Sequence, residues 1–460
     1  MKTRYIFYVA ILAFLASCQP EIKEFTPSSG DVDFSSYVAV GNSLTAGYSD
    51  GALYKSGQEA GWANILAQQL KTVGMQGEFK IPYMPNDLGV GFSGGVPVTK
   101  RVMGYSTDCF GNTSLGPVLA DPNANPVDLM TELIKSVAAE GPYNNIGVPG
   151  IKVSHLLYPG LGALNPYYGR FAVNPLADIL INEADRVNPT FFSLWVGNND
   201  VLGYSTSGGV GDTITSPALF TLAYTAVINH LLSLTDKGVL ANIPDVTAIP
   251  FFVTVPYNPI TLTRQGQVDS LNYGYTPYNQ LMEANGLPYR INFQLGSNPL
   301  VIYDKDMPLP DAYAQFKFRQ IKEDELVTLV VPQDSIKCAY WGTLKPVPDQ
   351  YVLTESEIAK VREATAAYNS TIETIAEQNN LAFVDMAAYM NQLRDNGIVV
   401  DGVTFTNKYV TGNAFSTDGV HLTPQGNALI ANLFIDAINT KYGSNIPHVA
   451  VSEYNPLILP

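Results

Sequence analysis

Five residues of this chain have the types and the order that acyl transfer requires. Ser43 lies in "VAVGNSLTAGY", directly after a short apolar run. Gly150 lies in "GVPG" and Asn199 in "GNND", each after a further apolar run. Asp418 and His421 lie in "STDGVHLTPQG", three residues apart. A serine hydroxyl needs an adjacent base, which a histidine supplies, and a carboxylate can hold the second imidazole nitrogen. We therefore expect these residues to form one site.

The elements that would bring them together follow from the hydrophobic pattern. From Tyr37 onward, apolar strand-like runs alternate with helix-periodic segments, which is typical of a parallel α/β sheet. In such a sheet the strand-to-helix turns lie at one edge, so Ser43, Gly150 and Asn199 are expected to converge. The predicted strands cover residues 37–40, 144–148, 191–196, 248–255 and 381–386.

Three helix starts are marked by their capping residues. Ser216 followed by Pro217 predicts a helix that runs to about Leu234. The stretch "TESE", from Thr354, has the spacing of a capping box. Thr423 followed by proline predicts the start of the last helix, so His421 is expected on a loop that this helix start fixes.

Taken together, these residues resemble the SGNH family of hydrolases, also called the GDSL esterases and lipases. The resemblance implies a three-layer α/β/α sandwich around a mostly parallel sheet of about five strands, similar to the flavodoxin-like arrangement. It implies a serine ester hydrolase whose catalytic triad is Ser43, His421 and Asp418. The oxyanion would be held by the backbone N–H groups of Ser43 and Gly150 and by the side-chain amide of Asn199. No metal or organic cofactor is implied.

Two further residues bear on the resemblance. Trp62, in "GWANILAQQL", matches the tryptophan that opens the first helix in many family members. Asn42 departs from the family, which usually has Gly-Asp-Ser-Leu where this chain has "GNSL". Asparagine fills the same space and still accepts hydrogen bonds, so the local charge changes while activity is expected to remain.

The N-terminus has the pattern of a bacterial lipoprotein signal. Lys2 and Arg4 precede an apolar run, and residues 15–18, "LASC", resemble a lipobox. The resemblance implies cleavage before Cys18 and a lipid on its sulfur, hence a membrane-anchored protein of the bacterial cell envelope. Gln19 follows the cysteine in place of the aspartate associated with inner-membrane retention, which favours the outer membrane. Residues 1–17 would be the signal peptide.

The remaining chain is predicted to be one hydrolase domain. Residues 18–35 are polar and are predicted to form a tether, and the domain is expected over residues 36–460. Segments near 75–140 and 257–350 are rich in Pro, Gly, Tyr and Asn and are expected to be insertions on this domain. Cys109 and Cys338 could pair in an oxidising compartment, but their spacing alone does not decide this. The oligomeric state also stays open.

Composition limits the partners. The formal net charge is −15, from 26 basic and 41 acidic residues, and no basic run could follow a phosphate backbone, so nucleic acid is not expected. The expected partner is an ester substrate. The predicted anchor and the 27 tyrosines and 20 phenylalanines favour a lipid or acyl-chain ester. A carbohydrate acetylesterase acting on acylated glycans, and a surface lipoprotein that binds without turnover, are the alternatives.

Competing motifs are weaker. The stretch "GFSGG", residues 91–95, matches a nucleophile elbow but lacks a preceding strand and a following helix, so we expect a flexible loop. The stretch from Asp121 to Glu132 has calcium-ligand spacing, but Pro126 stands where the loop needs glycine. A turn capped by Asn125 is expected instead. The other histidines form no pair with metal-ligand spacing.

Overall fold

The computed structural model describes residues 25–458, and its core is a sheet of five parallel strands. The strand order is β15–β8–β7–β1–β6, and all four neighbouring pairs are parallel. This confirms the predicted sheet and its size. The strands are β1 (Tyr37–Gly41), β6 (Asn145–Gly147), β7 (Phe191–Trp195), β8 (Gly238–Ala241) and β15 (Ala382–Val384).

The sheet is buried on both faces, because its side chains alternate between two apolar clusters. In β1, Tyr37 and Ala39 enter one cluster, whereas Val38 and Val40 enter the other. All five residues of β1 are buried. A strand that is apolar at every position is what a sheet between two helical layers requires.

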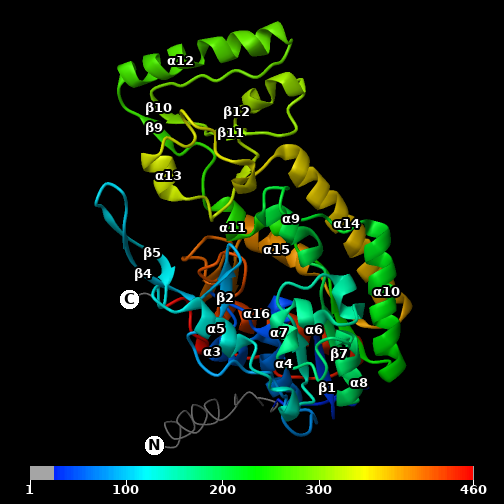
Figure 1. Cartoon of the computed structure of the whole chain (residues 1–460). Coiled ribbons are helices and arrows are strands. Elements are labelled where there is room, and N and C mark those ends of the chain that lie inside the picture. Colours follow the sequence, from blue (N-terminus) through cyan, green and yellow to red (C-terminus); the bar gives the residue numbers. More distant parts are fainter. Residues whose placement is uncertain (1–24, 459–460) are drawn as a thin grey trace, which may run out of the picture.

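Two helices cover the first face and two others cover the second (Figure 1). On the first face, α4 (Trp62–Lys71) packs on α16 (Pro424–Tyr442), where Trp62 stacks on Phe434 with 4.2 Å between ring centroids. On the second face, α10 (Pro217–Leu234) packs on α14 (Glu355–Gln378) through a similar stack at 4.0 Å. The protein is therefore a three-layer α/β/α sandwich, as expected.

The predicted helix starts are confirmed. The Ser216 side chain accepts the backbone N–H of Leu219 at 3.3 Å, and Pro217 begins α10. Thr423 accepts from Gly426 at 2.9 Å at the start of α16. Thr354 and Glu357 form the capping box of α14.

One predicted strand is wrong. Residues 248–255 do not form a strand: a short helix, α11 (Pro250–Val253), begins at Pro250, and the strand of the sheet lies earlier, at β8. A short apolar run fits a buried strand and a buried helix equally well. Here Pro250 decides, since proline lacks the N–H that a central strand donates and suits the first position of a helix.

The predicted tether is also partly wrong. Ser28 pairs with Asn445, and Val32 and Phe34 are buried in the first apolar cluster. Phe34 contacts Phe191 of β7 edge to face, with 5.0 Å between the ring centroids. The folded part thus begins before residue 36. The predicted signal peptide and Cys18 lie outside the described residues.

Within residues 25–458, α10 is the one helix long and apolar enough to cross a membrane by length and composition. Its Phe220, Tyr224 and Val227 are buried in the second apolar cluster. These contacts are those of a helix in the layer that covers the sheet.

The other elements of the sandwich are short helices and one hairpin. They are α2 (Ser43–Ala46), α3 (Lys55–Glu59), α6 (Leu161–Leu164), α7 (Pro166–Gly169), α8 (Glu183–Val187), α9 (Asn199–Thr206), α15 (Met386–Asp395), β16 (Ile398–Val400) and β17 (Val403–Phe405).

The first insertion region holds two hairpins and a helix. The stretch expected as a flexible loop at 91–95 belongs to the first of these hairpins. The elements are β2 (Gly91–Ser93), β3 (Val96–Val98), β4 (Arg101–Thr107), β5 (Thr113–Leu119) and α5 (Pro126–Leu133).

The second insertion region has apolar clusters of its own, one of which packs under the long helix α12. In Figure 1, α12 lies at the end of the molecule far from the central sheet. The elements are β9 (Ile260–Leu262), α12 (Gln265–Ala284), β10 (Gly296–Asn298), β11 (Val301–Tyr303), β12 (Phe318–Gln320), β13 (Leu326–Val327), α13 (Gln333–Cys338) and β14 (Val352–Leu353).

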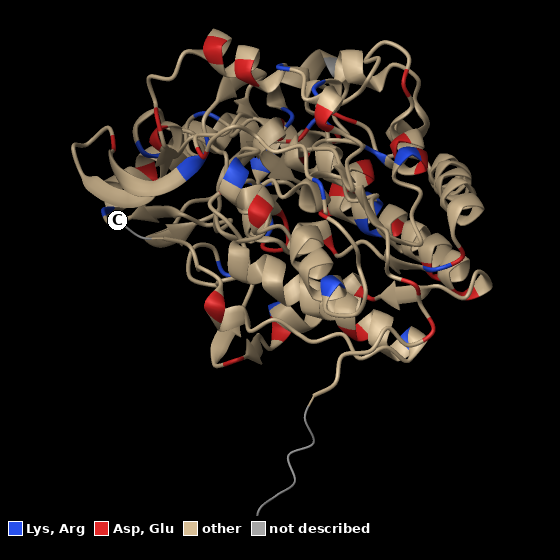
Figure 2. Ribbon diagram, turned by 90° about the horizontal axis from the view of Figure 1, so that it is seen from below, with Lys and Arg blue, Asp and Glu red and all other residues tan. Residues whose placement is uncertain are grey.

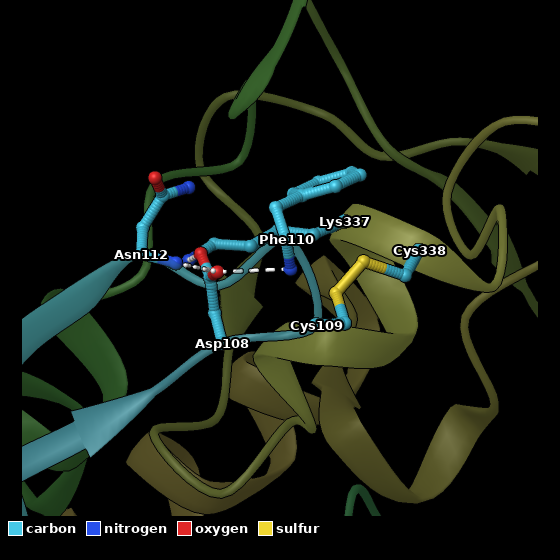
Figure 3. The surroundings of a disulfide bond; sticks show 6 residues. All are labelled: Asp108, Cys109, Phe110, Asn112, Lys337 and Cys338. Carbon is cyan, nitrogen blue, oxygen red and sulfur yellow. Dashed lines mark hydrogen bonds and ion pairs between the residues drawn. A yellow bond between two sulfur atoms is a disulfide. The ribbon is translucent and has the colours of Figure 1, made fainter.

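A disulfide joins the two insertion regions (Figure 3). Cys109, at the tip of the β4–β5 hairpin, pairs with Cys338 at the end of α13, across 229 residues of sequence and 6.6 Å between Cα atoms. Beside it, Lys337 donates to Asp108 at 3.1 Å. The question that the cysteine spacing left open is thereby answered: the hairpin is tied to the second insertion.

Charged residues are spread over the elements in the view of Figure 2, with acidic positions beside basic ones. The acidic excess of the sequence is thus distributed over the fold.

Candidate active site

Ser43 begins the short helix α2 immediately after β1. Asn42 caps this helix, since its Oδ1 accepts the backbone N–H of Leu44 at 3.0 Å. Gly41, the last residue of β1, lies so close to β7 that a Cβ there would come 2.6 Å from the carbonyl oxygen of Trp195. A glycine is therefore needed where the strand turns into the serine helix.

Two hydrogen bonds join Ser43 to Asp418 through His421. The Oγ of Ser43 is 2.8 Å from Nε2 of His421, and Nδ1 of His421 is 2.8 Å from Oδ2 of Asp418. The three side chains come from two segments that lie 378 residues apart in sequence. The structure thus brings together the three residues predicted as a triad. The histidine lies between the serine and the carboxylate, as proton transfer from the serine needs.

Asp418 is surrounded by donors. Its Oδ1 accepts the backbone N–H groups of Val420 at 2.9 Å and His421 at 2.8 Å, and the hydroxyl of Ser416 at 3.1 Å. Burial alone would raise the pKa of Asp418, but the positive charge of protonated His421 and these hydrogen bonds outweigh it and lower the pKa well below its usual range. Asp418 therefore stays ionised and fixes the orientation of the imidazole.

A second segment, which the sequence did not single out, holds the loop that carries Asp418 and His421 in place. Ser49 donates its hydroxyl to the carbonyl oxygen of Leu422 at 2.9 Å, and Gly51 donates its N–H to Oδ2 of Asp418 at 2.8 Å. Between them, Oδ1 of Asp50 accepts the N–H of Thr417 at 3.1 Å and its hydroxyl at 2.8 Å. Residues 49–51 come three residues after the end of α2, so they set the loop with His421 relative to Ser43.

The second insertion region reaches the same loop. Leu329 donates its N–H to the carbonyl oxygen of Phe251 at 2.7 Å, and Phe251 donates to Gly419 at 3.0 Å. Gly419 has a positive φ of 71°, and a Cβ there would come within 2.9 Å of the Leu329 side chain. The insertion thus packs directly against the turn between Asp418 and His421.

The predicted oxyanion donors lie at the ends of neighbouring strands. Within residues 25–458, the backbone N–H groups of Ser43 and Gly150 donate to no acceptor. Gly150 has a φ of 81°, and a Cβ there would meet nothing within 4 Å, so the glycine is required for its backbone angle. Asn199 begins α9 after β7 and donates one Nδ2 hydrogen to the carbonyl oxygen of Ile151 at 2.9 Å. The second Nδ2 hydrogen of Asn199 is free to donate to a substrate.

A family model for the GDSL-like lipases and acylhydrolases matches residues 37–285, more than half of the chain. This protein belongs to the GDSL-like lipase/acylhydrolase family. It is therefore an ester-cleaving hydrolase. No curated protein sequence matches the chain.

Similarity to solved structures is distant. An acetyl-xylooligosaccharide esterase variant, Axe2 from Geobacillus stearmophilus, is 10% identical with a TM-score of 0.34, over 89% of this chain and 96% of the other. LAE5, an alpha/beta hydrolase enzyme from the Lake Arreo metagenome in Spain, is 10% identical with a TM-score of 0.33 over the same shares. A protein described as a GDSL-like lipase from Parabacteroides merdae is 11% identical with a TM-score of 0.33, over 90% and 100%. Identities and TM-scores this low support no conclusion about the substrate of this GDSL hydrolase.

An apolar cavity of about 90 Å³ opens beside Ser43 and His421, the predicted nucleophile and base of this GDSL hydrolase. Ser43, His421, Asn198 and Asn199 lie at its polar end. The rest of the wall comes mainly from α9, α15, α16 and the segments 244–249 and 414–422. It includes Leu202, Val246, Ile249, Met386, Met390 and Phe415. Such a wall suits a hydrocarbon chain and offers few groups that could bind a sugar hydroxyl.

Tyr48 is a further site residue that the sequence did not indicate. Its ring lies against the imidazole of His421, with 4.7 Å between the ring centroids. Its hydroxyl donates to the carbonyl oxygen of Gly51 at 2.6 Å. The tyrosine therefore covers one side of the base and restricts its rotation.

Asp200, the residue after Asn199 in "GNND", is fully buried. Its Oδ2 accepts the N–H of Val153 at 3.0 Å, while within the described chain its Oδ1 has no partner. Burial raises the pKa of Asp200 to about 6, because the hydrogen bond only partly compensates the loss of hydration. Through Val153, Asp200 holds the segment that follows Gly150.

No group of three or more His, Cys, Asp or Glu side chains in the described part of the chain could hold a metal ion. His230 and His448 each contact one aspartate, at 3.0 and 2.7 Å. In the stretch with calcium-ligand spacing, Asn125 caps α5 by accepting the N–H of Val127, as expected.

Proposed function

We propose that this GDSL hydrolase cleaves acyl-chain esters through a covalent acyl-enzyme on Ser43. The observation that carries the proposal is the pair of 2.8 Å hydrogen bonds from Ser43 to His421 and from His421 to Asp418. A buried carboxylate with a lowered pKa, an oriented imidazole and a serine at the end of a strand form a complete nucleophilic apparatus.

The reaction has two halves. Ser43 Oγ attacks the ester carbonyl carbon while His421 Nε2 takes its proton, and the C–O bond to the alcohol breaks as His421 returns that proton to the leaving oxygen. Water then attacks the acyl-enzyme, again with His421 as base, and releases the carboxylic acid and Ser43. Asp418 stays ionised throughout and stabilises the imidazolium that forms in each half.

The negative charge that develops on the carbonyl oxygen requires donors already in place. The free N–H groups of Ser43 and Gly150, together with the second Nδ2 hydrogen of Asn199, supply them. Donors fixed by the backbone and by a bond to Ile151 need little reorganisation as the charge develops, which is the main source of rate enhancement in such sites.

The apolar cavity supports an acyl chain as the specificity element. Its wall of Leu, Val, Ile, Met and Phe side chains begins next to Ser43 and His421, so the chain attached to the reacting carbonyl has an apolar place to lie. Burying each methylene contributes about 0.8 kcal/mol, so several methylenes would improve binding by more than tenfold.

A panel of p-nitrophenyl esters from acetate to palmitate, tested beside acetylated xylan oligosaccharides, examines this proposal. We expect kcat/KM to rise at least tenfold from acetate to a medium-chain ester. A higher kcat/KM on the acetylated glycan than on every acyl ester would favour a carbohydrate acetylesterase instead. The Ser43→Ala variant should lose hydrolysis while keeping the wild-type unfolding temperature. Full retained activity in that variant would contradict the role of Ser43.

We further propose that Cys18 carries a lipid that anchors the enzyme to the cell envelope, at the outer membrane. The lipobox-like residues 15–18 and Gln19 support this. Metabolic labelling of the expressing bacterium with an alkyne fatty acid should mark the wild-type protein and leave Cys18→Ser unmarked. Equal labelling of both proteins, or labelling of neither, would contradict lipidation at Cys18. Fractionation of the wild type then tests the outer membrane.

A further inference from the structure

Asn198 lies beside Asn42, the residue that replaces the aspartate usual in the family. Oδ1 of Asn42 accepts the N–H of Leu44 at 3.0 Å, which fixes which end of the Asn42 amide faces the helix. Its Nδ2 must therefore face away, and it donates to Oδ1 of Asn198 at 3.1 Å. Both side chains are almost fully buried, with 1% and 5% exposed, so water does not substitute for this bond.

The direction of that bond determines what Asn198 can offer to a substrate. Because Oδ1 of Asn198 is occupied by Asn42, the Nδ2 group is turned the other way. Within the described residues this Nδ2 donates to no acceptor. Asn198 nevertheless lines the catalytic cavity together with Ser43, Asn199 and His421. The Asn198 amide is thus nearly buried, lies beside the nucleophile and has two unused donor hydrogens. A buried donor needs an acceptor, which a bound substrate would supply.

We propose that Asn198 is a fourth donor to the oxyanion, with its Nδ2 hydrogen-bonded to the former carbonyl oxygen when Ser43 attacks. Asn42 is the positioning residue that holds the Asn198 amide in the donating orientation. The inference rests on the proposed function, because it requires an oxyanion formed at Ser43.

The asparagine at position 42 is what makes this orientation favourable. An aspartate there would still accept the N–H of Leu44, but its second oxygen would face Oδ1 of Asn198. Two acceptors at about 3 Å repel each other, so Asn198 would turn its amide over and donate to the carboxylate. Its oxygen would then point where its NH₂ group points now. Whether residue 42 carries an amide nitrogen or a second oxygen thus decides which group Asn198 presents to the oxyanion. With asparagine it presents its NH₂ group, and with aspartate it would present its oxygen.

The test is a double-mutant cycle with Asn42→Asp, Asn198→Ala and the double variant, measured on one p-nitrophenyl ester. Asn198→Ala should lower kcat about 10- to 100-fold with KM changed less than threefold, because the bond forms only in the transition state. Asn42→Asp, which keeps the shape of the side chain, should lower kcat at least tenfold. In the Asn198→Ala background the same substitution should cost less than threefold, since no amide remains to turn over.

A second measurement separates this role from a structural one. An alkylboronic acid forms a tetrahedral adduct on serine with a negatively charged oxygen, so its affinity reports oxyanion stabilisation. We expect Asn198→Ala to weaken boronic acid binding at least tenfold while the unfolding temperature stays within 2 °C of wild type.

Two results would overturn the inference: Asn198→Ala with kcat within threefold of wild type, or Asn42→Asp with the same cost in both backgrounds. If Asn198→Ala does not fold, the nearly isosteric Asn42→Asp decides alone, through its kcat and its boronic acid affinity. Covalent labelling of Ser43 by a fluorophosphonate in the wild type distinguishes the failures. Absent labelling refutes the proposed function, and labelling with an unaffected Asn198→Ala variant refutes only the role of Asn198.

Discussion

The backbone N–H of Gly51 donates to Oδ2 of Asp418 at 2.8 Å, and the same oxygen accepts from Nδ1 of His421 at 2.8 Å. The segment that follows the nucleophile helix therefore holds the carboxylate that orients the base. Ser43 and His421 are aligned through this short backbone connection, although most of the chain lies between them in sequence.

Asp50 should be needed for that alignment. Asp50→Ala removes two hydrogen bonds to Thr417, at 3.1 and 2.8 Å, and one from the hydroxyl of Tyr54 at 2.6 Å. We expect kcat to fall about 10- to 100-fold, because a shift of 1 Å at a reacting group can cost about 100-fold. Asp50→Asn keeps an acceptor for Thr417 and should stay within about fivefold of wild type. Equal activity of Asp50→Ala and wild type would show that the loop is set by other contacts.

The Asn199 side chain should contribute through the transition state alone. Removing one oxyanion donor typically costs about 100- to 1,000-fold in kcat, and we expect Asn199→Ala to lie in this range with little change in KM. Steady-state kinetics on a short acyl ester measures both constants. A variant within threefold of wild type in kcat would remove Asn199 from the mechanism.

Asp200 should make stability depend on pH. Its pKa of about 6 lies above the ordinary 3.8, so the folded state binds the proton more tightly than the unfolded state. The stability that this gives is present below about pH 4 and is lost as the pH rises through 6. Asp200→Asn cannot lose a proton. We therefore expect the free energy of unfolding of this variant, compared with wild type, to increase by roughly 2–3 kcal/mol between pH 4 and pH 8. Chemical unfolding of both proteins at the two pH values tests this, and a constant difference would contradict it.

The cavity should set the acyl-chain preference. Met390 lies in its wall and is buried, so Met390→Trp would fill the space that we assign to the chain. We expect kcat/KM for an octanoate ester to fall at least tenfold, while the value for acetate changes less than threefold. Met390→Leu conserves the volume and should leave both values near wild type. Equal losses on both esters would place the acyl chain elsewhere.

The Cys109–Cys338 bridge should stabilise the contact between the hairpin and the second insertion. A disulfide typically contributes about 2–4 kcal/mol, so the double Cys→Ser variant should unfold at a temperature several degrees lower. Reductant should lower the unfolding temperature of wild type and leave that of the variant unchanged. A wild type insensitive to reductant would mean that the bridge adds no stability.

Local signals in the sequence predicted local structure well. Ser216 and Thr423 marked their helices correctly, because a cap is a contact between residues a few positions apart. The motifs around Ser43 and His421 also predicted that these side chains and Asp418 lie together, and the two 2.8 Å hydrogen bonds show this contact, while their catalytic role stays a prediction. The strand at 248–255 was wrong because its apolar run does not by itself distinguish a strand from a helix.

Apart from the contact of Ser43 with His421, the contacts between distant segments were the ones that the sequence did not reveal. Nothing in the pattern around Asp50 indicates Thr417, which lies 367 residues further along the chain. Phe34 stands in a polar stretch, yet it is buried against Phe191. The Asn42–Asn198 bond likewise joins two loops through side chains whose types alone do not predict a contact.

The most direct test of the account is to treat the purified protein with a fluorophosphonate and locate the label by tandem mass spectrometry. A fluorophosphonate reacts with a serine that an adjacent base has activated. We predict one covalent adduct per chain, on Ser43, and a rate of labelling at least 100-fold slower in His421→Ala. Labelling at another residue, or a rate in His421→Ala equal to that of wild type, would contradict the central claim that Ser43 is the nucleophile and His421 its base.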